Sequence, residues 1–146
     1  MGLISLKTYI IPSNIEKMCC TIKVMLKDIQ DACSCISEDT LFELKVILNE
    51  LLSNAIKHGN KMNELKKLKV VSGLTTDSRI FFVIQDEGEG FDCRCYESLI
   101  DNSNNPCFDF DNLKETGRGI YIVKELCDRV IYNEKGNRVI AIKKLL

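Results

Sequence analysis

Two hydrophobic periods alternate along the 146 residues of this chain and set the order of its elements. Apolar side chains at every second position, or in a short continuous run, indicate a strand, whereas spacings of three and four indicate a helix. The segments with a strand pattern are residues 3–10, 68–74, 79–85, 130–132 and 138–142. The segments with a helical pattern are residues 15–31, 39–58 and 120–127.

This order of elements predicts an α+β fold. It is a two-layer α/β sandwich, in which three helices lie on one face of a mixed, mostly antiparallel sheet. Ile80–Ile84 is apolar without alternation, which predicts a central strand buried on both faces. Ser13 or Asn14 is expected to cap the first helix, and Gly59 to end the second in a left-handed conformation. The length predicts a single domain, residues 1–146, that can bury its own core.

Charge and hydropathy exclude several classes of function. The chain has 20 Lys and Arg against 21 Asp and Glu, so no overall field attracts nucleic acid or anionic lipid. No run approaches the roughly 18 apolar residues of a membrane span. No signal peptide precedes the eight cysteines, which favours a reduced, cytoplasmic protein.

The first motif with chemical potential is Glu50 and Asn54 on the second predicted helix. Residues four apart share a helix face, so both side chains project away from the leucine seam. An Asn carbonyl oxygen suits Mg²⁺, and a carboxylate one turn earlier can take a proton from an attacking hydroxyl. Taken alone, this pair is also the pattern of a solvated helix face.

Two glycine-containing segments follow. Asp86-Glu87-Gly88-Glu89-Gly90 ends the apolar strand, where a carboxylate can accept a hydrogen bond from an exocyclic amine such as adenine N6. Thr116-Gly117-Arg118-Gly119 precedes the third helix, whose first N–H groups and dipole can bind phosphate. Neither the Rossmann nor the P-loop spacing is present. Each segment alone is equally an ordinary turn.

In this order and spacing, the three motifs resemble those of the Bergerat-fold (GHKL) ATPases. That superfamily includes gyrase-type ATPases, Hsp90-type chaperones, MutL-type proteins, histidine kinases and the anti-sigma factor serine kinases. The resemblance covers about residues 38–146 and implies that the chain binds ATP and Mg²⁺. Asn54 would coordinate the Mg²⁺ that bridges the ATP phosphates, and Glu50 would be the general base.

The resemblance also assigns the glycine-containing segments. Asp86 would hold the adenine amine, with Gly88 and Gly90 shaping the base pocket. Gly117 and Gly119 would bring backbone amides to the phosphates, in a loop that also contains Thr116 and Arg118. Residues 91–116 would form the ATP lid. Arg118 would either steady a phosphate or face water, and Lys57 and His58 would either edge the pocket or form a solvated helix end.

Length and Glu50 distinguish among the branches of this superfamily. Gyrase, MutL and Hsp90 relatives have further domains that couple ATP to movement, and we expect none in 146 residues. A sensor histidine kinase needs a phosphoacceptor histidine, whereas the one histidine here, His58, follows the Glu/Asn motif. The chain thus resembles an anti-sigma factor serine/threonine kinase. That family implies phosphorylation of a small antagonist protein, sequestration of an RNA polymerase sigma factor, and usually a homodimer.

Two other functions stay open at this point. The chain could be a nucleotide-dependent protein that binds its partner without phosphorylating it, although such a protein would not need a base at Glu50. It could also be a detached histidine-kinase-type catalytic domain. The last strand departs from the family pattern, because Asn137 follows Gly136 where relatives often have Thr. The adenine contact from that strand is therefore unassigned.

The cysteines do not form a recognisable metal motif. Cys33 and Cys35, like Cys93 and Cys95, are separated by one residue, which is tighter than the usual two to four between zinc ligands. We therefore expect no metal site built from cysteines. The cysteines near helical stripes are expected to be small apolar packing residues: Cys19, Cys20, Cys33 and Cys127. The cysteines in the predicted lid are positions where oxidation would perturb nucleotide binding: Cys93, Cys95 and Cys107.

Overall fold

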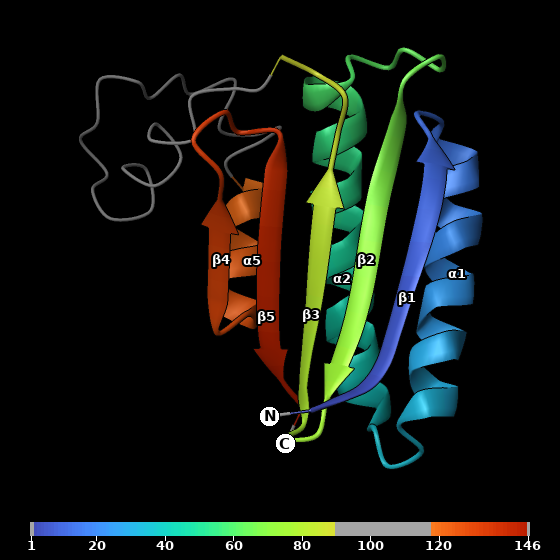
Figure 1. The fold of residues 1–146 in the computed structure, drawn as a ribbon, viewed down its shortest axis with the longest axis vertical. Helices are drawn as coiled ribbons and strands as arrows, with labels where there is room; N and C mark the ends of the chain where they lie inside the picture. Colours follow the sequence, from blue (N-terminus) through green and yellow to red (C-terminus); the bar gives the residue numbers. More distant parts are fainter. Residues whose placement is uncertain (1, 90–117, 146) are drawn as a thin grey trace.

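The computed structural model describes residues 2–89 and 118–145, with the backbone alone at Arg118. Its elements are β1 (Leu3–Pro12), α1 (Ile15–Ala32), α2 (Glu38–Asn54), η1 (Ala55–Gly59), β2 (Lys67–Thr75), β3 (Arg79–Gln85), α5 (Arg118–Leu126), β4 (Arg129–Tyr132) and β5 (Arg138–Lys144). The strands form one sheet in the order β1-β2-β3-β5-β4, and every described pairing is antiparallel. The helices α1, α2 and α5 lie on one face of this sheet (Figure 1). The predicted α+β sandwich is confirmed, whereas the predicted lid lies outside the described residues.

Polar side chains set where α1 and α2 begin. Asn14 caps α1, because its Oδ1 accepts the N–H of Lys17 at 3.0 Å. Ser37 caps α2 in the same way, accepting the N–H of Thr40 at 3.1 Å. These bonds satisfy donors that the first helical turn leaves without intrahelical partners. Of the two predicted caps of α1, Asn14 is therefore correct, and Ser13 instead donates its hydroxyl to the carbonyl of Lys66 at 2.7 Å.

The end of α2 differs from the prediction. The α-helix stops at Asn54, and residues 55–59 form one turn of π-helix, closed by a 2.8 Å bond from the N–H of Asn60 to the carbonyl of Ala55. Gly59 does not have the expected left-handed conformation. A glycine is needed there for space, because a β-carbon on Gly59 would lie 2.3 Å from Asp86 Oδ2. The π-turn thus brings the end of α2 into contact with the end of β3.

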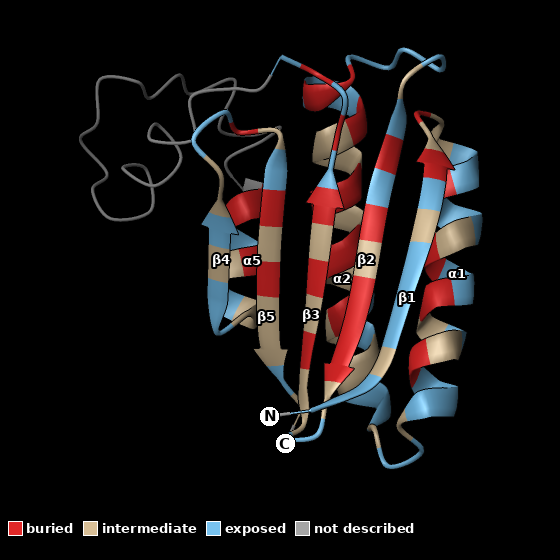
Figure 2. Cartoon of the chain, in the orientation of Figure 1, coloured by how far each residue is buried: buried red, intermediate tan, exposed pale blue. Residues whose placement is uncertain are grey.

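The core lies between the helices and one face of the sheet. Ile80, Phe82 and Ile84 of β3 are buried on this side, and buried residues concentrate on β2, β3 and α2 (Figure 2). The prediction that β3 is buried on both faces is wrong: Phe81 and Val83 are half-buried on the open face. No described helix covers that face, so within the described residues these side chains are shielded by the neighbouring strands alone.

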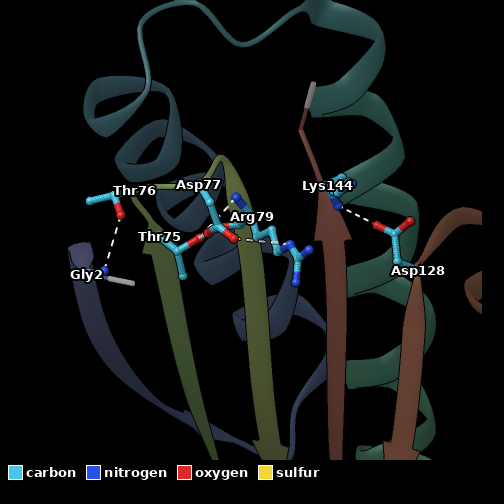
Figure 3. A network of polar contacts seen from close by, with 7 residues as sticks. All are labelled: Gly2, Thr75, Thr76, Asp77, Arg79, Asp128 and Lys144. Carbon is cyan, nitrogen blue, oxygen red and sulfur yellow. Dashed lines mark hydrogen bonds and ion pairs between the residues drawn. The ribbon is translucent and has the colours of Figure 1, made fainter.

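A polar network fixes the end of the sheet at the β2–β3 turn (Figure 3). Asp77 accepts a hydrogen bond from the hydroxyl of Thr75 and pairs with Arg79 at 3.4 Å. The hydrogen bond from Thr75 lowers the pKa of Asp77. Gly2 donates its N–H to the hydroxyl of Thr76 at 3.2 Å, which ties the start of β1 to the same turn.

None of the helices in the described part of the chain has the length and apolarity to cross a bilayer.

Candidate functional site

A pocket open to solvent lies between the end of α2, the end of β3 and the β4–β5 turn. These three segments meet at one end of the sheet (Figure 1). The pocket is lined by Leu51, Asn54, Ala55, Ile84, Asp86, Tyr132, Gly136, Asn137, Arg138 and Val139. Apolar walls with a few convergent polar groups are typical of a small-molecule site. Two residues predicted from the motifs, Asn54 and Asp86, therefore face the same pocket.

Asp86 is the acidic group of this pocket and is only 6% exposed. Its Oδ1 accepts the N–H of Gly88 at 2.8 Å, and its own N–H donates to the carbonyl of Asn137 at 2.9 Å. Oδ2 accepts no hydrogen bond from the described residues. Burial raises the pKa of the Asp86 carboxyl, although the bond from Gly88 acts in the opposite direction. The site thus presents a fixed oxygen that a ligand amine can reach.

Gly88 holds the turn after β3 against the end of η1. A β-carbon on Gly88 would lie 2.0 Å from the carbonyl oxygen of Gly59. Any larger residue would force these two backbone segments apart. Gly88 therefore supports the position of Asp86 by close backbone packing, a contact that the sequence motif did not specify.

The start of α5 lies against Glu50 and Asn54. A β-carbon on Gly119 would be 2.3 Å from Glu50 Oε2 and 3.6 Å from Asn54 Nδ2. Glu50 and Asn54 share a face of α2, as their spacing predicted. The fold thus brings the first and third motifs together, at the helix start where backbone N–H groups favour a phosphate.

Asn54 has an unsatisfied donor at this contact. Its Nδ2 is the one buried side-chain nitrogen or oxygen without a hydrogen-bond partner in the described ranges 2–89 and 118–145. Leaving a buried polar group unpaired costs about 1–3 kcal/mol, so such atoms are rare outside functional sites. A bound anionic ligand would satisfy this donor.

The side-chain oxygens at this contact also fit Mg²⁺. Over the described residues, His, Cys, Asp and Glu form no group of three or more that could hold a metal ion by themselves. Mg²⁺ does not require such a group, since it is commonly bound through one or two protein oxygens and the phosphates of a substrate. The side chains of Asn54 and Glu50 provide oxygens of this kind.

Several residues predicted from the motifs do not line the described pocket. Gly90, Thr116, Gly117 and the predicted lid lie outside the described residues, and Arg118 is described only as the first residue of α5. Lys57 and His58 are exposed on η1, and neither lines the pocket. These two residues are thus part of an exposed helix end.

Asn60 is a structural residue of the site that the sequence did not reveal. It is 1% exposed, and its Nδ2 donates to the Ser13 hydroxyl at 2.9 Å and to the Lys67 carbonyl at 3.2 Å. Its Oδ1 accepts the N–H of Glu87 at 2.8 Å. Asn60 therefore ties the turn after Asp86 to β1 and β2. No local pattern could have shown this role, because Ser13 and Glu87 are far from it in the sequence.

Replacing Asn60 is expected to destabilise the fold. Asn60→Ala would remove three hydrogen bonds and leave the N–H of Glu87 without its acceptor. The free energy of unfolding should fall by about 1–3 kcal/mol, as measured by urea denaturation. Asn49→Ala is the control, since the side chain of Asn49 makes, among the described residues, one exposed bond to the Lys45 carbonyl on its own helix. Equal stability of the two variants would contradict the role of Asn60.

The β4–β5 turn contributes Asn137 to the pocket wall. Its carbonyl accepts the N–H of Asp86, and its Oδ1 accepts a bond from Asn133 Nδ2 at 2.7 Å. Gly136 has a positive φ of 79°, which lets the chain turn back into β5. Asn137 therefore forms part of the pocket wall directly before β5.

Comparison with known proteins identifies the family of this chain. The family profile described as "Histidine kinase-like ATPase domain" matches residues 16–143. The serine-protein kinase RsbW of Staphylococcus epidermidis is 34% identical over 112 residues, which are 73% of this chain and 67% of that protein. RsbW of Staphylococcus aureus strain MSSA476 is 30% identical over 102 residues, which are 67% of this chain and 62% of that protein.

A solved structure, the histidine kinase domain from the Erythrobacter litoralis EL346 blue-light activated histidine kinase, has a TM-score of 0.46 and 16% identity. That comparison covers 70% of this chain and 42% of the other. The profile and the RsbW relatives confirm the resemblance seen in the motifs, and they do not favour a histidine-kinase-type or non-phosphorylating protein. The chain therefore belongs to the histidine kinase-like ATPase domain family, in the branch of the RsbW anti-sigma factor serine kinases.

Proposed function

We propose that this kinase transfers the γ-phosphoryl group of ATP to a serine or threonine of a small antagonist protein, and that it sequesters an RNA polymerase sigma factor. The observation that carries this proposal is the contact of the α5 start with Glu50 and Asn54. It supports the proposal because a candidate base, a candidate metal ligand and a candidate phosphate-binding helix start lie together. Asp86, in the adjoining pocket, supplies an acceptor for the base of the nucleotide.

In the proposed complex, each motif contacts one part of ATP. The carboxylate of Asp86 accepts the adenine amine, and Gly88 and Gly90 shape the surrounding turn. Asn54 contributes to the binding of Mg²⁺ and the phosphates. The backbone amides of Gly117 and Gly119 bind the phosphates, assisted by Thr116 and Arg118.

Glu50 is proposed to act as the general base. It would accept the proton of the substrate hydroxyl as that oxygen attacks the γ-phosphorus and ADP leaves. When bound, Mg²⁺ supplies positive charge that offsets the negative charge developing on the phosphates. The role of this chain is to hold the substrate hydroxyl in line with the γ-phosphorus and the leaving ADP oxygen, with the carboxylate within reach of the hydroxyl proton.

A homodimer is part of the same proposal, and the open face of the sheet is its candidate interface. On β1, Ile4, Leu6 and Ile10 are each more than half exposed on that face. Large contiguous patches of exposed apolar side chains are rare on monomeric proteins and usually mark interaction sites. Because a sigma factor acts in transcription, the proposal also places the chain in the cytoplasm.

The deciding experiment is incubation of the chain with radiolabelled ATP, Mg²⁺ and candidate antagonist proteins encoded beside it. Acid-stable label on serine or threonine of an antagonist would support the proposal. Acid-labile label would instead show histidine-type phosphorylation, and ATP binding without any transfer would show a nucleotide-dependent binding protein. Either of the last two results would overturn it.

A further inference from the structure

Two cysteines meet in the turn between α1 and α2. Cys33 Sγ lies 3.7 Å from Cys35 Sγ, and both residues are free thiols. Cys33 is half-buried, whereas Cys35 is exposed. This turn lies at the opposite end of the molecule from the nucleotide pocket (Figure 1). The proposed kinase chemistry uses neither residue.

Backbone hydrogen bonds of Cys33 fix the turn that contains both cysteines. Cys33 ends α1, donating its N–H to the carbonyl of Ile29 at 2.9 Å. Its own carbonyl accepts the N–H of Ile36 at 3.2 Å. Two residues of chain span at most about 7 Å, which is the largest Cα separation a disulfide tolerates. The two sulfur atoms can therefore bond after a small local movement.

We propose that Cys33 and Cys35 are a redox-active dithiol, a site of reversible oxidation by low-molecular-weight disulfides. This inference is independent of the proposed function. A structural metal site is not the better explanation, since the described residues around the pair provide no group of three ligands. A packing role accounts for Cys33 alone, because the side chain of Cys35 faces solvent.

The reaction is a two-step thiol–disulfide exchange. The thiolate of Cys35 attacks one sulfur of glutathione disulfide, forming a mixed disulfide and releasing one glutathione thiolate, which takes up a proton. Cys33 then loses its proton to water as its sulfur attacks Cys35 Sγ, and the second glutathione leaves and is protonated. The two protein thiols lose two electrons in all, and glutathione disulfide is reduced to two glutathione molecules.

The surroundings of the two thiols set this order. Burial, with the hydrogen bond to Cys35, raises the pKa of the Cys33 thiol. Cys33 thus stays protonated at neutral pH and reacts slowly with a reagent in solution. The exposed Cys35 therefore attacks the reagent first, and Cys33 is positioned to resolve the mixed disulfide within the molecule.

The test uses the full chain and oxidised glutathione, followed by an acid quench, alkylation and trypsin. Tryptic peptide 28–45 contains only these two cysteines, and peptide 18–23 contains only Cys19 and Cys20. We expect peptide 28–45 to lose two hydrogen atoms and escape alkylation, and dithiothreitol to reverse both effects. Peptide 18–23, which has exposed thiols, serves as the internal control for reagent access.

Single variants separate the two roles. In Cys33→Ser, peptide 28–45 should carry glutathione on Cys35, because no thiol resolves the mixed disulfide. In Cys35→Ser, Cys33 should be recovered mainly as the alkylated thiol. The proposal is overturned if the wild-type peptide retains glutathione on Cys35, or if both thiols remain alkylated while Cys19 and Cys20 have reacted.

Discussion

Glu50→Gln is expected to slow phosphotransfer by about 100- to 10,000-fold, which is the usual contribution of a general base. Glutamine has the shape of glutamate, so the contact with the backbone of Gly119 is kept. The amide cannot accept the hydroxyl proton, so the loss should appear in the rate of the chemical step. Single-turnover transfer from labelled ATP to the antagonist measures that rate directly, and a binding titration measures ATP affinity separately.

The control for this variant is Glu125→Gln. Glu125 is exposed on α5, away from the buried side of the helix, so its loss of charge should leave both quantities unchanged. A Glu50→Gln variant that transfers phosphate at the wild-type rate would show that Glu50 is not the base. If the Glu50→Gln substitution lowers ATP affinity by the same factor as it lowers the phosphotransfer rate, Glu50 acts in ATP binding.

Asp86→Asn is expected to weaken ATP binding roughly 10- to 100-fold, the effect of losing a hydrogen bond to a charged group. The amide oxygen can still accept the N–H of Gly88, which leaves an N–H₂ group facing the adenine amine. Two donors then oppose each other in the pocket. Isothermal titration with ATP measures the loss, and Asp31→Asn, an exposed position on α1, is the matched control.

Inosine triphosphate makes this test specific. It lacks the exocyclic amine, so the Asp86→Asn substitution should cost ATP far more affinity than it costs inosine triphosphate. Equal losses for both nucleotides would contradict a contact between Asp86 and the amine. They would indicate that the substitution disturbs the pocket as a whole.

The same residue predicts a dependence on pH. Burial raises the pKa of Asp86 in the folded chain. Its contribution to ATP binding requires the ionised form, so affinity should be full above the raised pKa and fall as pH decreases through it. For folding the sign is opposite: the stability linked to this group is present below its unfolded pKa and is lost as pH rises through the folded pKa. Asp86→Asn should therefore be no less stable than wild type at neutral pH, as measured by urea denaturation.

Hydrophobic periodicity predicted the fold well because it reports which face of each element is buried. Every predicted helix and strand with described residues is present, within a few residues of its expected ends. The predictions that differ from the structure concern segments in which tertiary contacts override the local sequence pattern. Residues 55–59 form a π-helical turn in contact with Asp86. The apolar run of β3 has one face that no helix of the described residues covers.

The local parts of the candidate site follow from the amino-acid sequence. Glu50 and Asn54 share a face because the α-helical repeat places residues four apart together, and Asp86 ends β3 because the apolar run ends there. The sequence also predicted the branch of the family, through the order of the three motifs and the carboxylate of Glu50.

Which of these parts lie in contact depends on the packing of the whole fold. Several close contacts join segments from different elements. Gly119 lies against Glu50, Gly59 lies against Asp86, and Gly88 lies against the carbonyl of Gly59. The bonds of Asn60 to Ser13 and Glu87 do the same. A period along the chain specifies the face that an element buries but not the neighbour that covers it. That neighbour is selected by the packing of α2 and α5 on the sheet, and the packing depends on the whole chain at once.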